Sequence, residues 1–166
     1  MKQYLIEIKK LLQHKENVTT HEGLVSEIVM NNPANSDETL TCQKSLKIEI
    51  PEDYKHFLNE FNGGIIFKVE DFAGYRFLGT NEMLSENRFQ RENFGEDWAD
   101  DVLLFGVCLG DNEYLGFRVE KKSYKILHCI MELYPDEWQI IDTNFDHFLA
   151  KLIRERGQKY WLENHD

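Results

Sequence analysis

Acidic side chains crowd two stretches of this sequence, and aromatic residues lie among them. The first stretch, residues 92–101, contains no Lys or Arg but includes Phe94 and Trp98. This mixture suits a protein-binding surface, because aromatic side chains anchor a partner while peripheral charges steer it. A solvated loop that binds nothing is the competing interpretation. The candidate partner-binding residues of this stretch are Glu92, Glu96, Asp97, Trp98 and Asp100.

The second acidic group is divided between two connections of a predicted antiparallel meander. One connection follows a strand predicted at 102–107, and the other follows a strand predicted at 124–130. In a meander these connections lie at the same end of the sheet, so we expect one joint patch. The loop at 91–101 is expected at the opposite end, near Lys121 and Lys122, which would neutralise part of it. The candidate binding residues of the joint patch are Asp111, Glu113, Tyr134 and Asp136, with Glu132 and Glu137 beside them.

Metal or catalytic chemistry is only weakly indicated. The loop carboxylates would suit a metal-dependent hydrolase, but the acidic spacing of a calcium loop is missing, as are phosphate-loop and zinc-protease motifs. His128, Cys129 and Cys108 are a second option for a metal or thiol site. Adjacent strand residues point to opposite faces, however, so His128 and Cys129 do not easily share a ligand. We therefore expect two buried strand cysteines, no catalytic residue, no metal and no cofactor.

Size and charge narrow the choice of partner. The chain has 166 residues, which favours a single domain with a real core. Its net charge is −11, from 30 acidic and 19 basic side chains. Nucleic acid is then a poor ligand, since phosphate binding needs clustered Lys and Arg, and a basic protein is a better one. Solubility alone would also explain the acidity.

Targeting and redox signals point to the cytoplasm. The three cysteines are odd in number and widely spaced, so they form neither a disulfide framework nor a zinc pattern. The first residues are charged and amphipathic, unlike a signal peptide, and no apolar run is long enough to span a membrane. We expect a cytoplasmic protein without membrane contact.

The pattern of elements predicts helices first, then strands, then a closing helix. Helices are expected at 2–16, 21–30 and 36–46, and one or two helical turns at 80–90. A final helix should open at a capping box formed by Thr143 and Asp146. Short β-branched and aromatic runs predict strands at 65–69, 75–78, 102–107, 114–119, 124–130 and 138–141. This order predicts an α+β fold: a largely antiparallel, twisted sheet with N-terminal helices and a C-terminal helix packed on it.

The segment from Ile50 to Gly64 reads as a complete helix with both ends marked. Pro51 suits a first helical turn, and acidic residues follow it at the positive end of the helix dipole. Asn62-Gly63-Gly64 tolerates left-handed backbone and should end the helix. Its apolar positions recur at helical spacing, so we expect them in the core: Tyr54, Phe57, Leu58 and Phe61.

This segment resembles the hallmark of the SUKH superfamily, which is named after a fungal regulator of glucan synthesis and killer-toxin resistance. Members show a Leu/Ile-Pro-x-x-Tyr-x-x-Phe-Leu helix that ends in Asn-Gly-Gly. The matching residues are Ile50, Pro51, Tyr54, Phe57, Leu58, Asn62, Gly63 and Gly64. Looser similarities follow at Leu103-Leu104-Phe105-Gly106, at Gly110-Asp111-Asn112, at Tyr114-Leu115-Gly116-Phe117, and at Phe145, Phe148 and Leu149.

The resemblance implies a binding protein. Bacterial members are similar to immunity proteins that neutralise a cognate polymorphic toxin, often a nuclease. A basic nuclease domain would complement the acidity of this chain. A regulatory scaffold for cell-wall synthesis or signalling proteins is the alternative, as the fungal members suggest. We expect one domain over 1–166, with a helical extension at 1–35, a core at 36–153 and the end of the C-terminal helix at 154–166. Partner choice is expected to lie in that extension and in a long insertion at 85–100.

Overall fold

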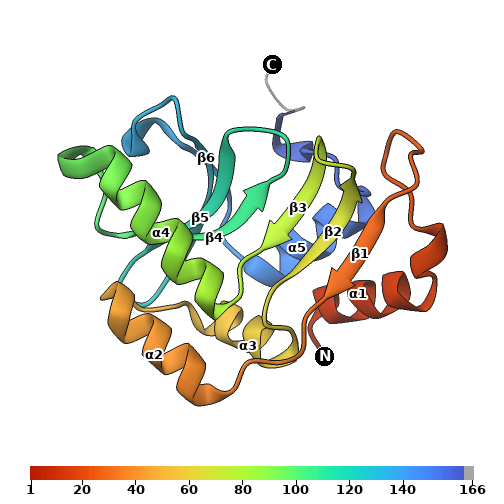
Figure 1. The fold of residues 1–166 in the computed structure, drawn as a ribbon, viewed down its shortest axis with the longest axis horizontal. Helices are drawn as coiled ribbons and strands as arrows, with labels where there is room; N and C mark the ends of the chain where they lie inside the picture. Colours follow the sequence, from red (N-terminus) through yellow and green to blue (C-terminus); the bar gives the residue numbers. More distant parts are fainter. Residues whose placement is uncertain (163–166) are drawn as a thin grey trace.

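The computed structural model describes residues 1–162. Within them, seven strands form one sheet in chain order, and every neighbouring pair is antiparallel (Figure 1). The strands are β1 Glu27–Met30, β2 Gly64–Val69, β3 Ala73–Phe77, β4 Val102–Cys108, β5 Glu113–Val119, β6 Tyr124–Ile130 and β7 Gln139–Asp142. The helices are α1 Gln3–Gln13, α2 Ser36–Leu46, α3 Glu52–Glu60, α4 Thr80–Phe94 and α5 Phe145–Arg154. The α+β fold expected from the sequence is thereby confirmed.

Four short 3₁₀ helices complete the described chain. They lie in connections or at the end of the described chain, where a single tight turn changes the direction of the backbone. Their bounds are η1 Lys15–Asn17, η2 Gly95–Asp97, η3 Pro135–Glu137 and η4 Tyr160–Leu162.

Two apolar clusters hold the helices to the two faces of the sheet. The larger cluster joins α1, α3 and α5 to one face, where Phe105 and Phe117 stack with their ring centroids 4.2 Å apart. The smaller cluster lies on the other face, under the C-terminal end of α4. Successive side chains of β5 point to opposite faces of the sheet and so reach different clusters. Leu115 belongs to the larger cluster, and Tyr114 packs against the smaller one.

Helix α3 lies at the centre of the larger cluster, as its apolar stripe predicts. Tyr54, Phe57 and Leu58 are fully buried, while Phe61 is half-buried at the end of the stripe. The Tyr54 hydroxyl donates a hydrogen bond to the carbonyl of Leu78 at 2.7 Å. A buried phenol needs such a partner, so this bond fixes α3 against the chain leaving β3.

The Asn-Gly-Gly turn after α3 is required by close backbone contacts. Gly63 has φ +82°, and a Cβ there would lie 2.6 Å from the amide nitrogen of Gly79. Asn62 fastens the same contact, because its Oδ1 accepts a hydrogen bond from the amide of Thr80 at 2.8 Å. The hallmark turn therefore joins the start of β2 to the start of α4.

The structure corrects three local predictions. Residues 21–30 contain strand β1 and no helix, because Ile28 alone points into the core while Val25 and Val29 stay exposed. Helix α4 continues beyond 90 to Phe94. Helix α5 begins after Asn144, whose Oδ1 accepts from the amide of His147 at 2.9 Å, so Thr143 is not the cap.

The predicted helical end at 154–166 is also shorter than expected. Helix α5 ends at Arg154, and the chain continues through a bend into η4. Residues 163–166 lie outside the described part of the chain.

Candidate functional site

The acidic residues predicted at 92–101 lie at the end of α4 and in the segment after it. Gly95, with φ +57°, ends the helix and turns the chain into η2. The side chains of Glu92, Glu96, Asp97 and Asp100 are exposed. None of these four carboxylates forms an ion pair within residues 1–162. Their negative charges are therefore presented to solvent, and the nearest electrostatic contact, between Asp100 and Arg91, is not an ion pair.

Trp98 lies beneath this acidic segment. Only 9% of the residue is exposed. Its ring packs edge-on against Phe94 and Trp138, with centroid distances of 5.6 and 6.1 Å. Sequence reasoning placed Trp98 among the partner-contacting residues, whereas the structure gives it the role of a support for the acidic segment.

The two acidic stretches meet on one face of the sheet. Their separation, expected from the sequence, is wrong: Trp138 follows the second stretch and contacts both Phe94 and Trp98 of the first. Arg118 also joins them, since its guanidinium donates to the carbonyl of Pro135 at 3.0 Å and lies 3.7 Å from Asp101. Helix α4 brings the two segments together. It lies across this face of the sheet and carries the chain from the end of β3 to the acidic segment that precedes β4 (Figure 1).

We define the acidic surface as the exposed carboxylates of residues 92–100 and 136–137, which form no ion pair within residues 1–162, together with Tyr134. Tyr134 is 58% exposed, and its backbone amide donates to the carboxylate of Glu137 at 2.9 Å, which stiffens the turn at η3. The tyrosine ring is exposed to solvent on a turn that also carries the unpaired acids Asp136 and Glu137. The acidic surface comprises Glu92, Glu96, Asp97, Asp100, Tyr134, Asp136 and Glu137.

Asp111 and Glu113 have a different environment from the acidic surface. Lys159 lies between them, with its Nζ donating to Asp111 at 2.8 Å and also to Glu113. His128 Nε2 lies 2.7 Å from Oε2 of Glu113, the same oxygen that accepts from Lys159. Burial raises the pKa of Glu113, but the bonds from Lys159 and His128 outweigh it and hold that pKa below its usual value. These two carboxylates are largely neutralised within the protein.

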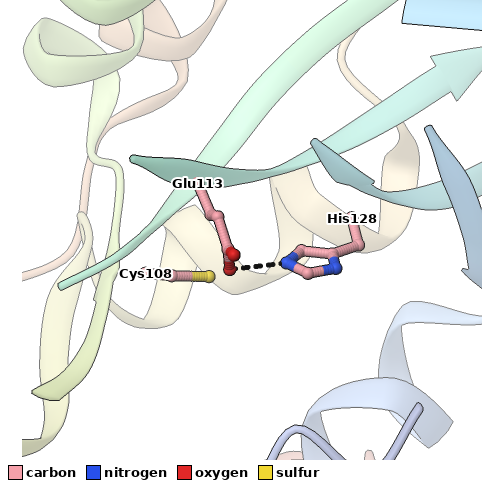
Figure 2. A group of neighbouring side chains, drawn as sticks. All are labelled: Cys108, Glu113 and His128. Carbon is pink, nitrogen blue, oxygen red and sulfur yellow. Dashed lines mark hydrogen bonds and ion pairs between the residues drawn. The ribbon is translucent and has the colours of Figure 1, made fainter. Parts of the chain in front are cut away.

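The structure also gathers Cys108, Glu113 and His128 on one face of the sheet, with their side chains pointing toward one another (Figure 2). Cys108 is the cross-strand partner of Glu113, and His128 is the partner of Leu115, one diagonal step away. Cys129 points to the opposite face, as strand alternation predicts.

Sequence reasoning considered His128 with the cysteines but did not include Glu113 in that group. The register of the hairpin around Gly110-Asp111-Asn112 would have identified it, because that turn places positions 108 and 113 opposite each other. Burial raises the pKa of the Cys108 thiol to about 12, so it is protonated at neutral pH.

A cavity of about 430 Å³ lies next to this group. Its lining includes Cys108 and Lys159, so it reaches the edge of the buried group. Tyr75 closes one side and donates through its hydroxyl to the carbonyl of Gly157 at 2.8 Å, which fixes the segment after α5. Other residues that line it are Phe72, Leu109, Asp111 and Gln158.

Within residues 1–162, every helix is too short or too polar to cross a lipid bilayer. This observation agrees with the sequence, which contains no apolar run of the required length.

Comparison with known proteins places the fold and the hallmark motif in a family. The model of the SMI1/KNR4 family (SUKH-1) matches residues 33–151. The immunity protein RhsIB of Dickeya dadantii (strain 3937) is 27% identical over 128 residues, which cover 74% of this chain and 76% of that protein. The uncharacterized protein YnaB of Bacillus subtilis (strain 168) is 25% identical over 134 residues, which cover 80% of this chain and 85% of YnaB. The resemblance read from Ile50 to Gly64 is thereby confirmed.

Proposed function

Because the chain belongs to the SMI1/KNR4 family (SUKH-1), we propose that it is a cytoplasmic immunity protein that binds and neutralises a cognate toxin. The similarity to the immunity protein RhsIB supports this role. The protein acts by binding and blocking its partner, with no chemical step of its own. The acidic surface is the part of the chain that makes the contact.

The observation that carries this proposal is the lack of internal neutralisation at the acidic surface. Some acidic side chains elsewhere in the described chain, such as Glu7, Asp53 and Glu86, are paired with Lys or Arg, and unpaired ones such as Glu16, Glu49 and Asp71 lie apart from one another in the sequence. The carboxylates of the acidic surface have no such partner within residues 1–162. An external cationic surface would supply it, and opposite charges also accelerate the encounter of two proteins.

A toxin with a basic surface is the partner that this arrangement fits. A nuclease domain must attract phosphate, so its active-site surface carries Lys and Arg. An acidic inhibitor can occupy that surface and exclude the substrate. Tyr134 is then the aromatic anchor, because its ring is exposed and its backbone is fixed by Glu137, whereas Trp98 supports the surface from below.

The predicted contribution of Asp111 and Glu113 to binding is smaller. Lys159 already balances much of their charge, so they give a partner little unpaired charge to neutralise. Glu113 also points to the other face of the sheet, so it lies outside the proposed interface. The turn between the two acids is tied to Glu132, which accepts a hydrogen bond from Asn112 at 3.1 Å.

Charge reversal tests the proposal with a matched control. The test variant carries Glu96→Lys, Asp97→Lys and Asp100→Lys. The control variant carries Glu16→Lys, Glu49→Lys and Asp71→Lys, which are exposed residues on other elements and change the net charge by the same amount. Binding to a toxin encoded beside this gene is measured by calorimetry, protection by co-expression, and folding by thermal unfolding.

We expect the test variant to lose at least tenfold in affinity, about 1.4 kcal/mol, and to lose protection, while its unfolding temperature stays unchanged. The control should protect cells as the wild type does. Equal protection by both variants would place the interface elsewhere. If wild-type protein fails to protect against any neighbouring toxin, the immunity role itself is wrong.

A further inference from the structure

The group formed by Cys108, Glu113 and His128 lies on the face of the sheet away from the acidic surface. Glu113 lies on the same face of β5 as Leu115 and Phe117, which belong to the larger cluster, whereas the acidic surface covers the smaller one. Its position gives it no part in the proposed toxin contact. We propose that these three side chains form a binding site for one divalent transition-metal ion, with Zn²⁺ as the best fit.

Geometry supports this site. One donor atom from each residue, the Cys108 sulfur, a Glu113 oxygen and a His128 ring nitrogen, lies within 4.8 Å of the other two (Figure 2). Zinc bonds of about 2.0–2.3 Å in a tetrahedral arrangement place the donor atoms roughly 3.3–3.8 Å apart. Small side-chain rotations therefore suffice to bring all three donors to one ion. The ion would replace the present contact between His128 and Glu113.

The sheet holds the three donors in advance of binding. They come from β4, β5 and β6, three neighbouring strands whose register at this site is fixed by the pairs Cys108 with Glu113 and Leu115 with His128. Cys108 and His128 are 1% and 2% exposed, so the surrounding core restricts their rotation. A site on rigid strands loses little conformational entropy when a ligand arrives.

The donor types determine which ion fits. A thiolate, an imidazole and a carboxylate together are a zinc-type ligand set, whereas Ca²⁺ and Mg²⁺ require oxygen donors. Binding forms a metal–sulfur bond and releases the Cys108 thiol proton to water. The two negative ligands then balance the charge of the ion. A neutral buried centre avoids the cost of an uncompensated charge in the core.

Lys159 is the internal competitor of the ion. Its ammonium group occupies the cationic position at Glu113, but it is also bonded to Asp111 and can remain there when the metal arrives. The cavity lined by Cys108, Asp111 and Lys159 provides the path of entry. It also leaves room for a water molecule as the fourth ligand. Removing the lysine charge should therefore strengthen metal binding.

Cobalt is the probe for this site, because a bond between thiolate and Co²⁺ absorbs strongly in the near ultraviolet. Wild-type protein titrated with Co²⁺ should develop this band with one ion per chain, and Zn²⁺ should displace the ion and abolish the band. Zn²⁺ should also raise the unfolding temperature, whereas Mg²⁺ and Ca²⁺ should not. Lys159→Met should bind Co²⁺ more tightly than the wild type.

Two variants test the ligands, and a third is their control. Cys108→Ser and His128→Gln should each lose the band, and Cys129→Ser is the matched control that should keep it. Cys129 is also a buried thiol on the same sheet, but it faces the smaller cluster. If Cys108→Ser does not fold, His128→Gln alone tests the site. The proposal is wrong if the wild type shows no band, or if the band survives in Cys108→Ser.

The proposed metal site and the proposed toxin contact can be disproved independently of each other. Cys108→Ser and His128→Gln should protect cells from the toxin as well as the wild type does, because the site lies on the other face. The charge-reversal variant of the acidic surface should bind Co²⁺ as the wild type does.

Discussion

Two groups of carboxylates lie on opposite faces of the same sheet, and they differ in how their charge is balanced. At the acidic surface, Glu96, Asp97 and Asp100 are exposed and have no ion pair within the described chain. At the other group, Lys159 and His128 contact Glu113 inside the fold. Both groups consist of Asp and Glu side chains, so the count of acidic residues in a segment does not decide their role. The position of the nearest cation decides it.

The two groups also rest on different supports. The acidic surface lies over Phe94, Trp98 and Trp138, whose rings pack edge-on and fix the segment from below. Glu113 is fixed by its own strand and by the charged groups around it. Changes under the acidic surface should therefore act through packing, while changes at Glu113 should act through hydrogen bonding and charge.

The largest effect is expected where the acidic surface loses its support. Trp98→Ala should lower the free energy of unfolding by about 3–5 kcal/mol, because it removes a large buried ring and leaves a cavity. Urea denaturation followed by circular dichroism measures this change. Tyr134→Ala is the control, since that ring is exposed and its removal should leave stability nearly unchanged. Comparable losses in both variants would mean that Trp98 does not carry the segment.

A smaller loss is expected at the internally paired group. Glu113→Gln should lower the free energy of unfolding by about 1–3 kcal/mol, because His128 and Lys159 lose a charged hydrogen-bond acceptor in a partly buried site. Glu132→Gln provides the comparison at an exposed carboxylate on the neighbouring loop. If chemical denaturation finds the two variants equally stable, the bonds to Glu113 contribute nothing.

The pH dependence of stability should separate the two groups further. The folded-state pKa of Glu113 is held below its usual value of 4.5, so this group stabilises the protein above that pH. The stabilisation should disappear as the pH falls through the folded-state pKa. Acid unfolding curves of the wild type should therefore be steeper below pH 4.5 than those of Glu113→Gln. Parallel curves would show that the carboxylate keeps an ordinary pKa.

The smallest effect on stability is expected at a single exposed acid. Glu96→Gln should change the free energy of unfolding by less than about 0.5 kcal/mol, as for most surface substitutions without a partner. Its effect should be seen in the association rate with the toxin, which should fall and become less sensitive to salt. Stopped-flow measurements at two ionic strengths test this difference. A large loss of stability would show that Glu96 has an internal partner.

Much of the fold follows from local patterns. The stripe of Tyr54, Phe57 and Leu58 predicted a core helix, and short apolar runs predicted six of the seven strands, because period and turn chemistry are local signals. Strand β1 was missed, since the apolar positions in 21–30 fit a helix equally well and only pairing with β2 decides between them. The last turn of α4, from 91 to 94, was not predicted, because its polar and acidic residues do not continue the periodic spacing of apolar residues that marks a helix.

The candidate sites followed less completely, because they depend on contacts between distant segments. The sequence indicated an acidic and aromatic surface but did not show that Trp98 turns inward to meet Trp138. It indicated Asp111 and Glu113 as free acids, because Lys159 is 46 residues from Glu113 along the chain and only folding brings them together.

By itself, the sequence determined the family, the order of six of the seven strands and the large negative charge of this protein. These properties depend on residue types and on spacings of a few residues, and both can be read from the sequence without knowledge of the tertiary structure. Only the tertiary structure decided which carboxylates are unpaired and that Cys108, Glu113 and His128 share one face. The pairing of a charge and the meeting of three donors depend on distances of a few ångströms between segments, and the packing of strands and helices sets those distances.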